Sequence, residues 1–273
     1  MPELPEVETV RRSLDPLVRG RRVCDVEVRC AALRRPLPPD FGARLEGSRL
    51  IATSRRAKYL LLGLDSGQSW IVHLGMSGRL LHQPNRDRYS PATHDHVIAR
   101  LDDGAALVFN DPRRFGLMVL DDAERSPLLA DIGPEPLDRT SFHRDYLAAQ
   151  KRRTRRTIKD VLMDQHVVAG LGNIYVNEIL FLAGVRPRRR MPRVTTAECE
   201  RIVDATRSVI SEAIEHRGSS ISDFLDGIGR RGGYQWRRRV YDRADEPCAE
   251  CSTPIKCIVV GQRSSFYCAS CQR

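Results

Sequence analysis

The chain has 273 residues, of which 41% are hydrophobic and 29% are charged, a composition that suits a soluble protein with two modest domains. No apolar run approaches the length of a membrane span and the N-terminus is polar and acidic, so we expect neither a transmembrane helix nor a signal peptide. The net charge of +10, from 45 lysines and arginines against 35 acids, points to a polyanionic partner, with nucleic acid the first candidate.

The first element is predicted to be a helix that begins directly behind Met1 and Pro2. Its apolar residues recur at helical spacing: Val7, Val10, Leu14 and Leu17. We expect Met1 to be removed, which would leave Pro2 as a secondary amine with a pKa of roughly 7.7–8.0. Glu3 places a carboxylate beside this amine, a pairing that suits a Schiff-base nucleophile. An ordinary helix start, which also favours proline and acids, is the alternative.

Residues from about 20 to 120 are predicted to form an antiparallel β-sandwich. Arg21–Cys30 alternates, with Val26, Val28 and Cys30 on one face. Further strand-like runs are Arg49–Leu64, which carries Lys58, and Trp70–His73 after the turn Asp65–Gly67. A second turn, Asp102–Gly104, separates His96–Leu101 from Ala105–Phe109, and Arg86–Pro91 is expected to be a loop.

Two turn-like segments at strand ends, His73–Gly78 and Asn110–Gly116, carry apolar side chains next to arginine. The first contains Met76 and the second contains Arg113 and Phe115. Apolar wedges flanked by arginine suit insertion into a base stack. Burial of Met76 and Phe115 in the core is the alternative.

Residues 121 to 140 are predicted to be a domain boundary, and the pattern beyond it is helical. Helices are expected from Asp145, over Arg156–Gln165, over Ile174–Ala183 with Asn173 as N-cap and Gly184 as stop, and through Ile202–Ile214 behind a capping box at Thr195–Glu198. The basic run Lys151–Arg156 and the glycine turn Gly170–Gly172 indicate a helix pair that docks on a duplex. Gly218–Arg239, rich in glycine and arginine, is expected to be a mobile loop.

The four cysteines at the C-terminus form two Cys-x2-Cys pairs, Cys248/Cys251 and Cys268/Cys271, separated by sixteen residues. This pattern predicts one structural zinc ion and a reducing compartment, with disulfides as the alternative. The ribbon would present Arg263 on the hairpin Gly261–Ser265, where a phosphate contact and a solvated arginine are both open. The other cysteines are expected to act as small hydrophobes: Cys24, Cys30, Cys199 and Cys257.

Taken together, these segments resemble the formamidopyrimidine-DNA glycosylase family over nearly the whole chain. The resemblance rests on seven motifs in the family's order: MPELPEVETVRRSL at the start, RRAKYLLL at Arg55–Leu62, HLGMSG at His73–Gly78, HDH at His94–His96, NDPRRFG at Asn110–Gly116, GLGNIY at Gly170–Tyr175, and the terminal FYCASCQR. It implies an α+β protein with an N-terminal helix and antiparallel β-sandwich (1–135), a helix–two-turn–helix domain (136–240) and a zinc hairpin (241–273).

The resemblance also implies roles for individual residues. Pro2 would attack C1′ of the damaged nucleoside, and Glu3 would assist ring opening and proton transfers. Glu6 would support this start of the first helix, Pro2–Glu6, which we call the N-terminal post. Lys58 would act in β-elimination, and Arg263 would contact the lesion phosphate and assist δ-elimination. The DNA-binding residues would be His73, Met76, His94, Arg113, Phe115, Arg153 and Asn173. The family often has a basic residue at Thr154, so whether Arg153 or Arg155 supplies that charge stays open.

The function implied is removal of oxidised purines from double-stranded DNA, followed by β,δ-elimination, by a cytoplasmic monomer with one structural zinc. An endonuclease VIII-type enzyme for oxidised pyrimidines is the first alternative, although Leu4 and the full NDPRRFG segment resemble the purine-specific branch more closely. A zinc-ribbon nucleic-acid binder without catalysis is the second, and it would leave Pro2, Glu3 and Lys58 without a role.

Overall fold

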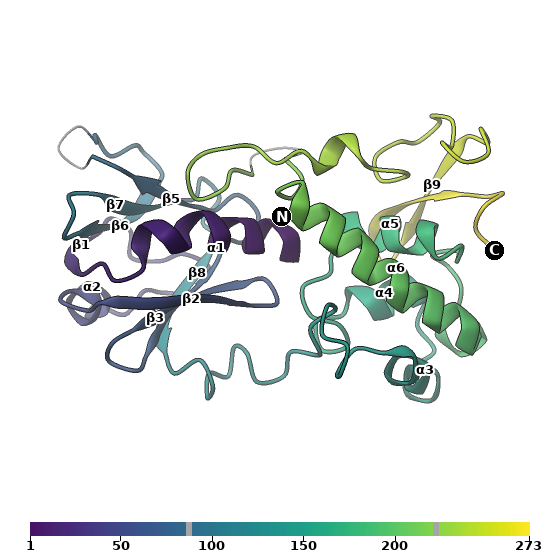
Figure 1. Ribbon diagram of the computed structural model, residues 1–273, viewed down its shortest axis with the longest axis horizontal. Helices are drawn as coiled ribbons and strands as arrows, with labels where there is room; N and C mark the ends of the chain where they lie inside the picture. The colour runs from purple at the N-terminus through teal and green to yellow at the C-terminus, as the bar shows by residue number, and fades with distance from the viewer. Residues whose placement is uncertain (86–88, 221–223) are drawn as a thin grey trace. The chain divides into compact units, whose positions relative to one another are not determined.

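A computed structural model describes residues 1–85, 89–220 and 224–273 of the chain. It divides into two compact units (Figure 1). The first contains Met1–Asp131 and His216–Gln235, and the second contains Ile132–Glu215 and Trp236–Arg273. The segment 216–235 thus packs with the N-terminal residues, although it lies inside the range expected for the helical domain.

The first unit is built from one long helix and two four-stranded antiparallel sheets. Helix α1 (Leu4–Val18) contacts strands of both sheets, and Val7, Val10 and Leu14 of its apolar face are completely buried in their shared core, whereas Leu17 is partly buried. One sheet has the order β1-β6-β7-β5 and the other β2-β3-β4-β8. Their bounds are β1 Val23–Val28, β2 Leu50–Arg56, β3 Tyr59–Leu64, β4 Ser69–His73, β5 Arg79–Gln83, β6 Asp95–Leu101, β7 Ala106–Asn110 and β8 Leu117–Asp121, with a short helix α2 at Phe41–Leu45.

The expected helix and both expected turns are confirmed, whereas two details of the strands are wrong. The run Arg49–Leu64 is a hairpin and not a single strand, because the chain reverses between β2 and β3 at Ala57, whose φ is +51°. No glycine, proline or asparagine marks this turn. Val28 does not share the buried face of Val26, since it ends an edge strand and is 39% exposed. Residues 86–88 of the expected loop Arg86–Pro91 lie outside the described residues.

The second unit contains four α-helices within its described residues and a C-terminal hairpin (Figure 1). They are α3 (Arg144–Arg153), α4 (Ile158–Met163), α5 (Asn173–Leu182), α6 (Thr196–Glu215), β9 (Ile255–Val260) and β10 (Arg263–Cys268), with a 3-10 turn at Met191–Arg193. A second 3-10 turn, Tyr234–Trp236, lies where the chain passes from the first unit to the second. Helix α5 packs against both α6 and β10. The capping box before α6 is confirmed, since Thr195 N–H donates to Glu198 at 2.7 Å and Glu198 N–H donates back at 3.1 Å.

Asn173 is not the N-cap of α5, as the sequence suggested. Gly172 occupies that position and Asn173 is the first helical residue. Its amide donates instead to the carbonyl of Ser264 in the hairpin, at 3.1 Å. A tertiary partner has thus replaced the local cap that asparagine favours.

Within the segment Gly218–Arg239, residues 218–220 and 224–235 belong to the first unit and residues 236–239 to the second. Gly227 N–H donates to the hydroxyl of Ser13 in α1 at 2.9 Å, and Tyr234 is completely buried. Residues 221–223 lie outside the described part of the chain.

Candidate active site and nucleic-acid interface

The N-terminal post is held by two buried carboxylates. Glu3 is 3% exposed and Glu6 is 1% exposed, and together they form a capping box at the start of α1. The Glu6 carboxylate accepts from Glu3 N–H at 2.8 Å and from Ser219 N–H at 2.7 Å. Gly218 leaves it room, because a Cβ there would lie 2.7 Å from Glu6 Oε1. Pro2 is buried directly before this network, so its nitrogen is held on a fixed support.

Lys58 lies in the turn between β2 and β3 and is 6% exposed. Arg55 ties this turn to α1: its guanidinium donates to the carbonyl of Ala57 at 2.9 Å and lies 3.6 Å from the carboxylate of Glu8. Lys58 is therefore a nearly buried amine in the same unit as Pro2.

His73, at the end of β4, is kept uncharged at neutral pH. Burial, and then the positive charge of Lys58, lower the pKa of His73 to about 4. Its Nδ1 accepts from Gly75 N–H at 3.0 Å, so the remaining proton belongs on Nε2. The ring packs 4.8 Å from that of Tyr59. A contact of His73 with DNA would therefore be a hydrogen bond and not an ion pair.

Met76 and Phe115 are exposed, so the alternative that both are core residues is wrong. Met76 is 42% exposed and Phe115 is 44% exposed, whereas Phe109 in the neighbouring strand is completely buried. The guanidinium of Arg113, also exposed, lies 4.7 Å from the centre of the Phe115 ring, a cation–π contact. The two loops thus present an apolar pair with one cation, as insertion into a base stack requires.

Asp111, which sequence reasoning left without a role, joins these two loops. It is completely buried, and its carboxylate accepts from the hydroxyl of Ser77 at 2.6 Å and from Gly116 N–H at 2.7 Å. Gly75, with φ +64°, lies directly against the backbone of Phe115, where any Cβ would collide. The motif around Asp111 was visible in the sequence, but its hydrogen bond to the other loop was not.

His94 is exposed and lies just before β6. The carbonyl of His94 accepts from Asp111 N–H at 3.0 Å, which fixes its backbone beside the loop of Phe115. Its imidazole is available to a ligand of the first unit.

In the second unit, two side chains hold the hairpin that carries Arg263. Lys159, completely buried in α4, donates from Nζ to the carbonyl of Ser264 at 2.8 Å and to the hydroxyl of Ser265 at 2.6 Å. Asn173 donates to the same carbonyl of Ser264. Burial lowers the pKa of Lys159 to about 8. Lys159 was missed because it follows a basic run and carries no sequence signal of burial.

The basic run Lys151–Arg156 does not form one face. Lys151, Arg152 and Arg153 close the last turn of α3, whereas the rest of the run links α3 to α4. Arg153 is exposed, and Arg156 pairs with Asp164 at 2.7 Å.

The four C-terminal cysteines form one cluster in which all Sγ atoms lie within 4.8 Å of one another. The measured Sγ–Sγ distances of 3.4, 3.5 and 3.9 Å fit a tetrahedral zinc ion, which holds thiolates about 3.8 Å apart through bonds of about 2.3 Å. Four protein ligands leave no open position, so a zinc ion here is structural. The alternative of disulfides is not observed, since all four are free thiols.

The remaining cysteines, which the sequence analysis treats as small hydrophobes, differ in burial. Cys30 and Cys199 are buried, whereas Cys24 and Cys257 are exposed. Cys257 lies on β9 opposite Phe266 and does not belong to the zinc cluster.

These features define a class of protein: a sandwich unit with a buried N-terminal post, and a helical unit that supports a zinc ribbon with four cysteine ligands. Models of one family match nearly all of the chain: the formamidopyrimidine-DNA glycosylase N-terminal domain over residues 1–118, the H2TH domain of the same enzyme over 132–225, and a zinc finger found in FPG and IleRS over 245–273. The chain belongs to the formamidopyrimidine-DNA glycosylase family.

Full-length relatives agree with this assignment. The chain is 47% identical to a formamidopyrimidine-DNA glycosylase of Dinoroseobacter shibae over 285 residues and 48% identical to one of Thiobacillus denitrificans over 275 residues. Each alignment covers the whole of this chain and the whole of the relative. Among solved structures, the MutM (Fpg) protein of Thermus thermophilus matches with a TM-score of 0.87 and 38% identity over 99% of this chain and 98% of that one. A Lactococcus lactis Fpg in complex with DNA that contains an abasic site matches with a TM-score of 0.91 and 30% identity over 99% of both chains.

No helix among the described residues is long and apolar enough to cross a membrane.

Proposed function

We propose that the chain is a bifunctional DNA glycosylase and AP lyase of base-excision repair that removes oxidised purines from double-stranded DNA. The observation that carries the proposal is the N-terminal post, where Pro2 is buried directly before the capping box of Glu3 and Glu6. The relatives support it, since they are named formamidopyrimidine-DNA glycosylases and a Lactococcus lactis Fpg was solved with Fapy-dG-containing DNA.

In the proposed reaction, the Pro2 nitrogen, freed by removal of Met1, attacks C1′ and the bond from C1′ to the damaged base breaks. The base leaves with a proton, and opening of the sugar ring yields an iminium cation that joins Pro2 to C1′. Glu3 serves as the acid that protonates the ring oxygen. The iminium acidifies the C2′ proton, whose loss expels the 3′ phosphate, and a second elimination expels the 5′ phosphate.

The other residues act on DNA or on these eliminations. Lys58 assists β-elimination, and Arg263 holds the lesion phosphate and assists δ-elimination. Extrusion of a base costs a few kcal/mol and leaves a gap, which Met76 and Phe115 fill while Arg113 meets the unpaired partner base. The remaining phosphate and strand contacts are assigned to His73, His94, Arg153 and Asn173.

Four cysteines hold the structural zinc. We propose that the enzyme acts in the cytoplasm, and that it acts as a monomer because binding of one duplex needs no second subunit. Within the chain we assign catalysis to residues 1–135, duplex docking to 136–240 and the lesion phosphate to the zinc hairpin, 241–273.

The test is borohydride trapping on a duplex with one 8-oxoguanine opposite cytosine, alongside a duplex with an oxidised pyrimidine. An adduct that maps to Pro2 on the purine lesion is the expected result. An adduct only on the pyrimidine lesion would move the chain to the endonuclease VIII-type branch. Absence of adducts from folded, zinc-loaded protein would leave a DNA-binding protein without catalysis.

A further inference from the structure

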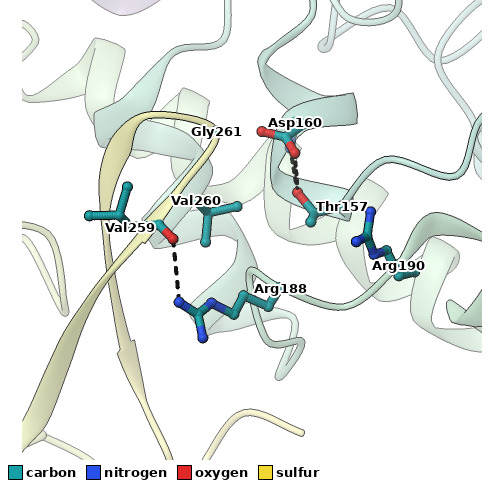
Figure 2. Close-up of a pocket in the computed structure, with 7 residues that line it drawn as sticks. All are labelled: Thr157, Asp160, Arg188, Arg190, Val259, Val260 and Gly261. Carbon is teal, nitrogen blue, oxygen red and sulfur yellow. Dashed lines mark hydrogen bonds between the residues drawn. The ribbon is translucent and has the colours of Figure 1, made fainter.

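Two neighbouring hollows in the second unit share one arginine. The first, of about 350 Å³, lies between the start of α4, the tip of the zinc hairpin and the segment before α6 (Figure 2). Its lining is Thr157, Asp160, Arg188, Arg190, Val259, Val260 and Gly261. The second, of about 550 Å³, is lined by Arg155, Arg190, Pro192 and Arg193. We call the four arginines of both hollows, Arg155, Arg188, Arg190 and Arg193, the arginine surface.

The positive charge of this surface is poorly compensated. The second hollow has three arginines and no acid in its lining, and the first has Asp160 alone, which already accepts from the hydroxyl of Thr157 at 2.6 Å. Arg190 donates to the carbonyl of Arg155 at 3.2 Å, a neutral partner. Arg189, between two members of the surface, instead makes a bidentate ion pair with Glu198 at 2.9 and 3.2 Å. Four arginines gathered around a single lining acid, Asp160, create a site for a polyanion.

The backbone beneath the surface is fixed. Residues Thr157 and Arg190 form a β-bridge, in which Ile158 N–H donates to Arg189 at 2.8 Å and Met191 N–H donates to Arg156 at 2.9 Å. On the other side of the first hollow, Gly261 lies so close to Asp160 that a Cβ would collide with its carboxylate. The guanidinium groups therefore start from a preorganised frame, which lowers the entropic cost of binding a ligand.

We propose that the arginine surface binds the sugar–phosphate backbone of DNA, in addition to the contacts proposed for Asn173 and Arg263. This inference rests on the proposed function, since it extends the same DNA partner. The planar fork of arginine fits phosphate oxygens in a bidentate manner. The hairpin residues Val259–Gly261 line the first hollow beside Arg188 and Arg190, and Arg263 follows two residues further on, so a strand held by Arg263 passes close to the arginine surface.

The experiment measures the affinity of zinc-loaded, full-length protein for a lesion-free duplex of about 30 base pairs over a salt series. Each phosphate contact adds about 0.9 to the slope of log K against log salt, so Arg190→Gln with Arg193→Gln should lower this slope by about 2. The matched control is Arg139→Gln with Arg144→Gln, two exposed arginines of the same unit outside both hollows. A third variant, Arg193→Glu, changes only one exposed side chain. It should also weaken binding, and it replaces the double variant in the test if that variant misfolds.

Equal slopes for the double variant and its control would overturn the inference. A second arm adds inorganic phosphate at constant ionic strength as a competitor of DNA. If the double variant is no longer inhibited by phosphate while its salt slope for DNA is unchanged, the surface binds free phosphate and not DNA. Borohydride trapping on the lesion duplex separates this test from that of the proposed function. A lowered salt slope of the double variant without a trapped adduct would support the arginine surface and refute the glycosylase proposal. A trapped adduct with an unchanged slope would support the glycosylase proposal and refute the arginine surface.

Discussion

At the scale of single residues, burial and hydrogen bonds hold the N-terminal post in place. Glu3 and Glu6 are almost completely buried, and their contacts belong to a hydrogen-bond network that the helix start requires. A carboxylate held in this way cannot move away from the amine beside it. The proposed nucleophile, Pro2, and the proposed acid, Glu3, therefore start from a backbone that the capping box fixes, and the proposed reaction needs no rearrangement of α1.

Replacement of Pro2 by glycine should retain DNA affinity and lower base excision by at least about 100-fold, since the nucleophile becomes a primary amine without the ring that holds it. Single-turnover excision and anisotropy on the same lesion duplex measure the two effects. Pro16→Ala, an exposed proline in the same helix, is the control and should leave both unchanged. Unaltered excision by the Pro2→Gly variant would refute the assignment of Pro2 as the nucleophile.

His73 should make the first unit less stable in mild acid. The folded protein keeps the pKa of His73 near 4, whereas the unfolded chain protonates it near 6.5. Between these values the unfolded state binds more protons, so stability falls as pH falls, by about 2 kcal/mol at pH 5 relative to pH 7. Urea unfolding followed at Trp70, in a Trp236→Phe background that leaves one tryptophan, measures this loss.

His73→Asn retains a hydrogen-bond acceptor for Gly75 N–H but has no group that titrates. This variant should lose about 2 kcal/mol less than the parent between pH 7 and pH 5. Identical losses would place the acid sensitivity elsewhere.

At the scale of elements, the wedge depends on two loops that clasp each other. The loop after β4 supplies Met76 and the loop after β7 supplies Phe115. Asp111 and the close approach at Gly75 join the two loops. A buried carboxylate with several donors is costly to disrupt, so the relative position of the two loops that carry Met76 and Phe115 is well defined.

Gly75→Ala should therefore separate the loops. The added Cβ meets the backbone of Phe115, and we expect a loss of at least about 2 kcal/mol of stability together with at least about 10-fold slower excision. Gly67→Ala has the same unfavourable positive φ, +84°, but no neighbour within 4 Å. This control should cost about 1 kcal/mol and leave excision unchanged. Thermal unfolding and single-turnover excision give the comparison, and equal effects of the two substitutions would contradict the clasp.

At the scale of the whole molecule, the zinc ribbon depends on both metal and helices. A segment of about 30 residues cannot bury enough apolar surface to fold alone. Its inner face is instead held by α4 and α5: Lys159 reaches Ser264 and Ser265, and Asn177 accepts from Phe266 N–H at 2.7 Å. Just before the ribbon, the carboxylate of Glu178 in α5 accepts from the backbone N–H groups of residues 239–241, at 2.7 to 3.0 Å.

Removal of zinc, by chelation or by Cys268→Ser, should unfold the hairpin and weaken DNA binding by at least about 100-fold, because Arg263 loses its support. The emission of Trp70, in the core of the first unit, should not change. Cys257→Ser, an exposed cysteine outside the cluster, is the control and should bind normally. Tight binding by metal-free protein would show that the ribbon is dispensable.

The sequence by itself determined the features that depend on local pattern. The spacing of Val7, Val10 and Leu14 predicted α1, the turns at 65–67 and 102–104 predicted two hairpins, and the cysteine spacing predicted the zinc cluster. These predictions are confirmed, because periodicity, turn chemistry and ligand spacing act over a few residues.

Only the tertiary structure decided the features that depend on contacts between distant segments. Exposure of Met76 and Phe115 and burial of Lys159 follow from packing between segments that are far apart in the chain. The link through Asp111 and the contact of Asn173 with Ser264 also join distant residues. Local propensity carries no information on such partners. For the same reason the turn at Ala57 and the gathering of four arginines around two hollows could not be predicted, since packing and not local pattern brings those residues together.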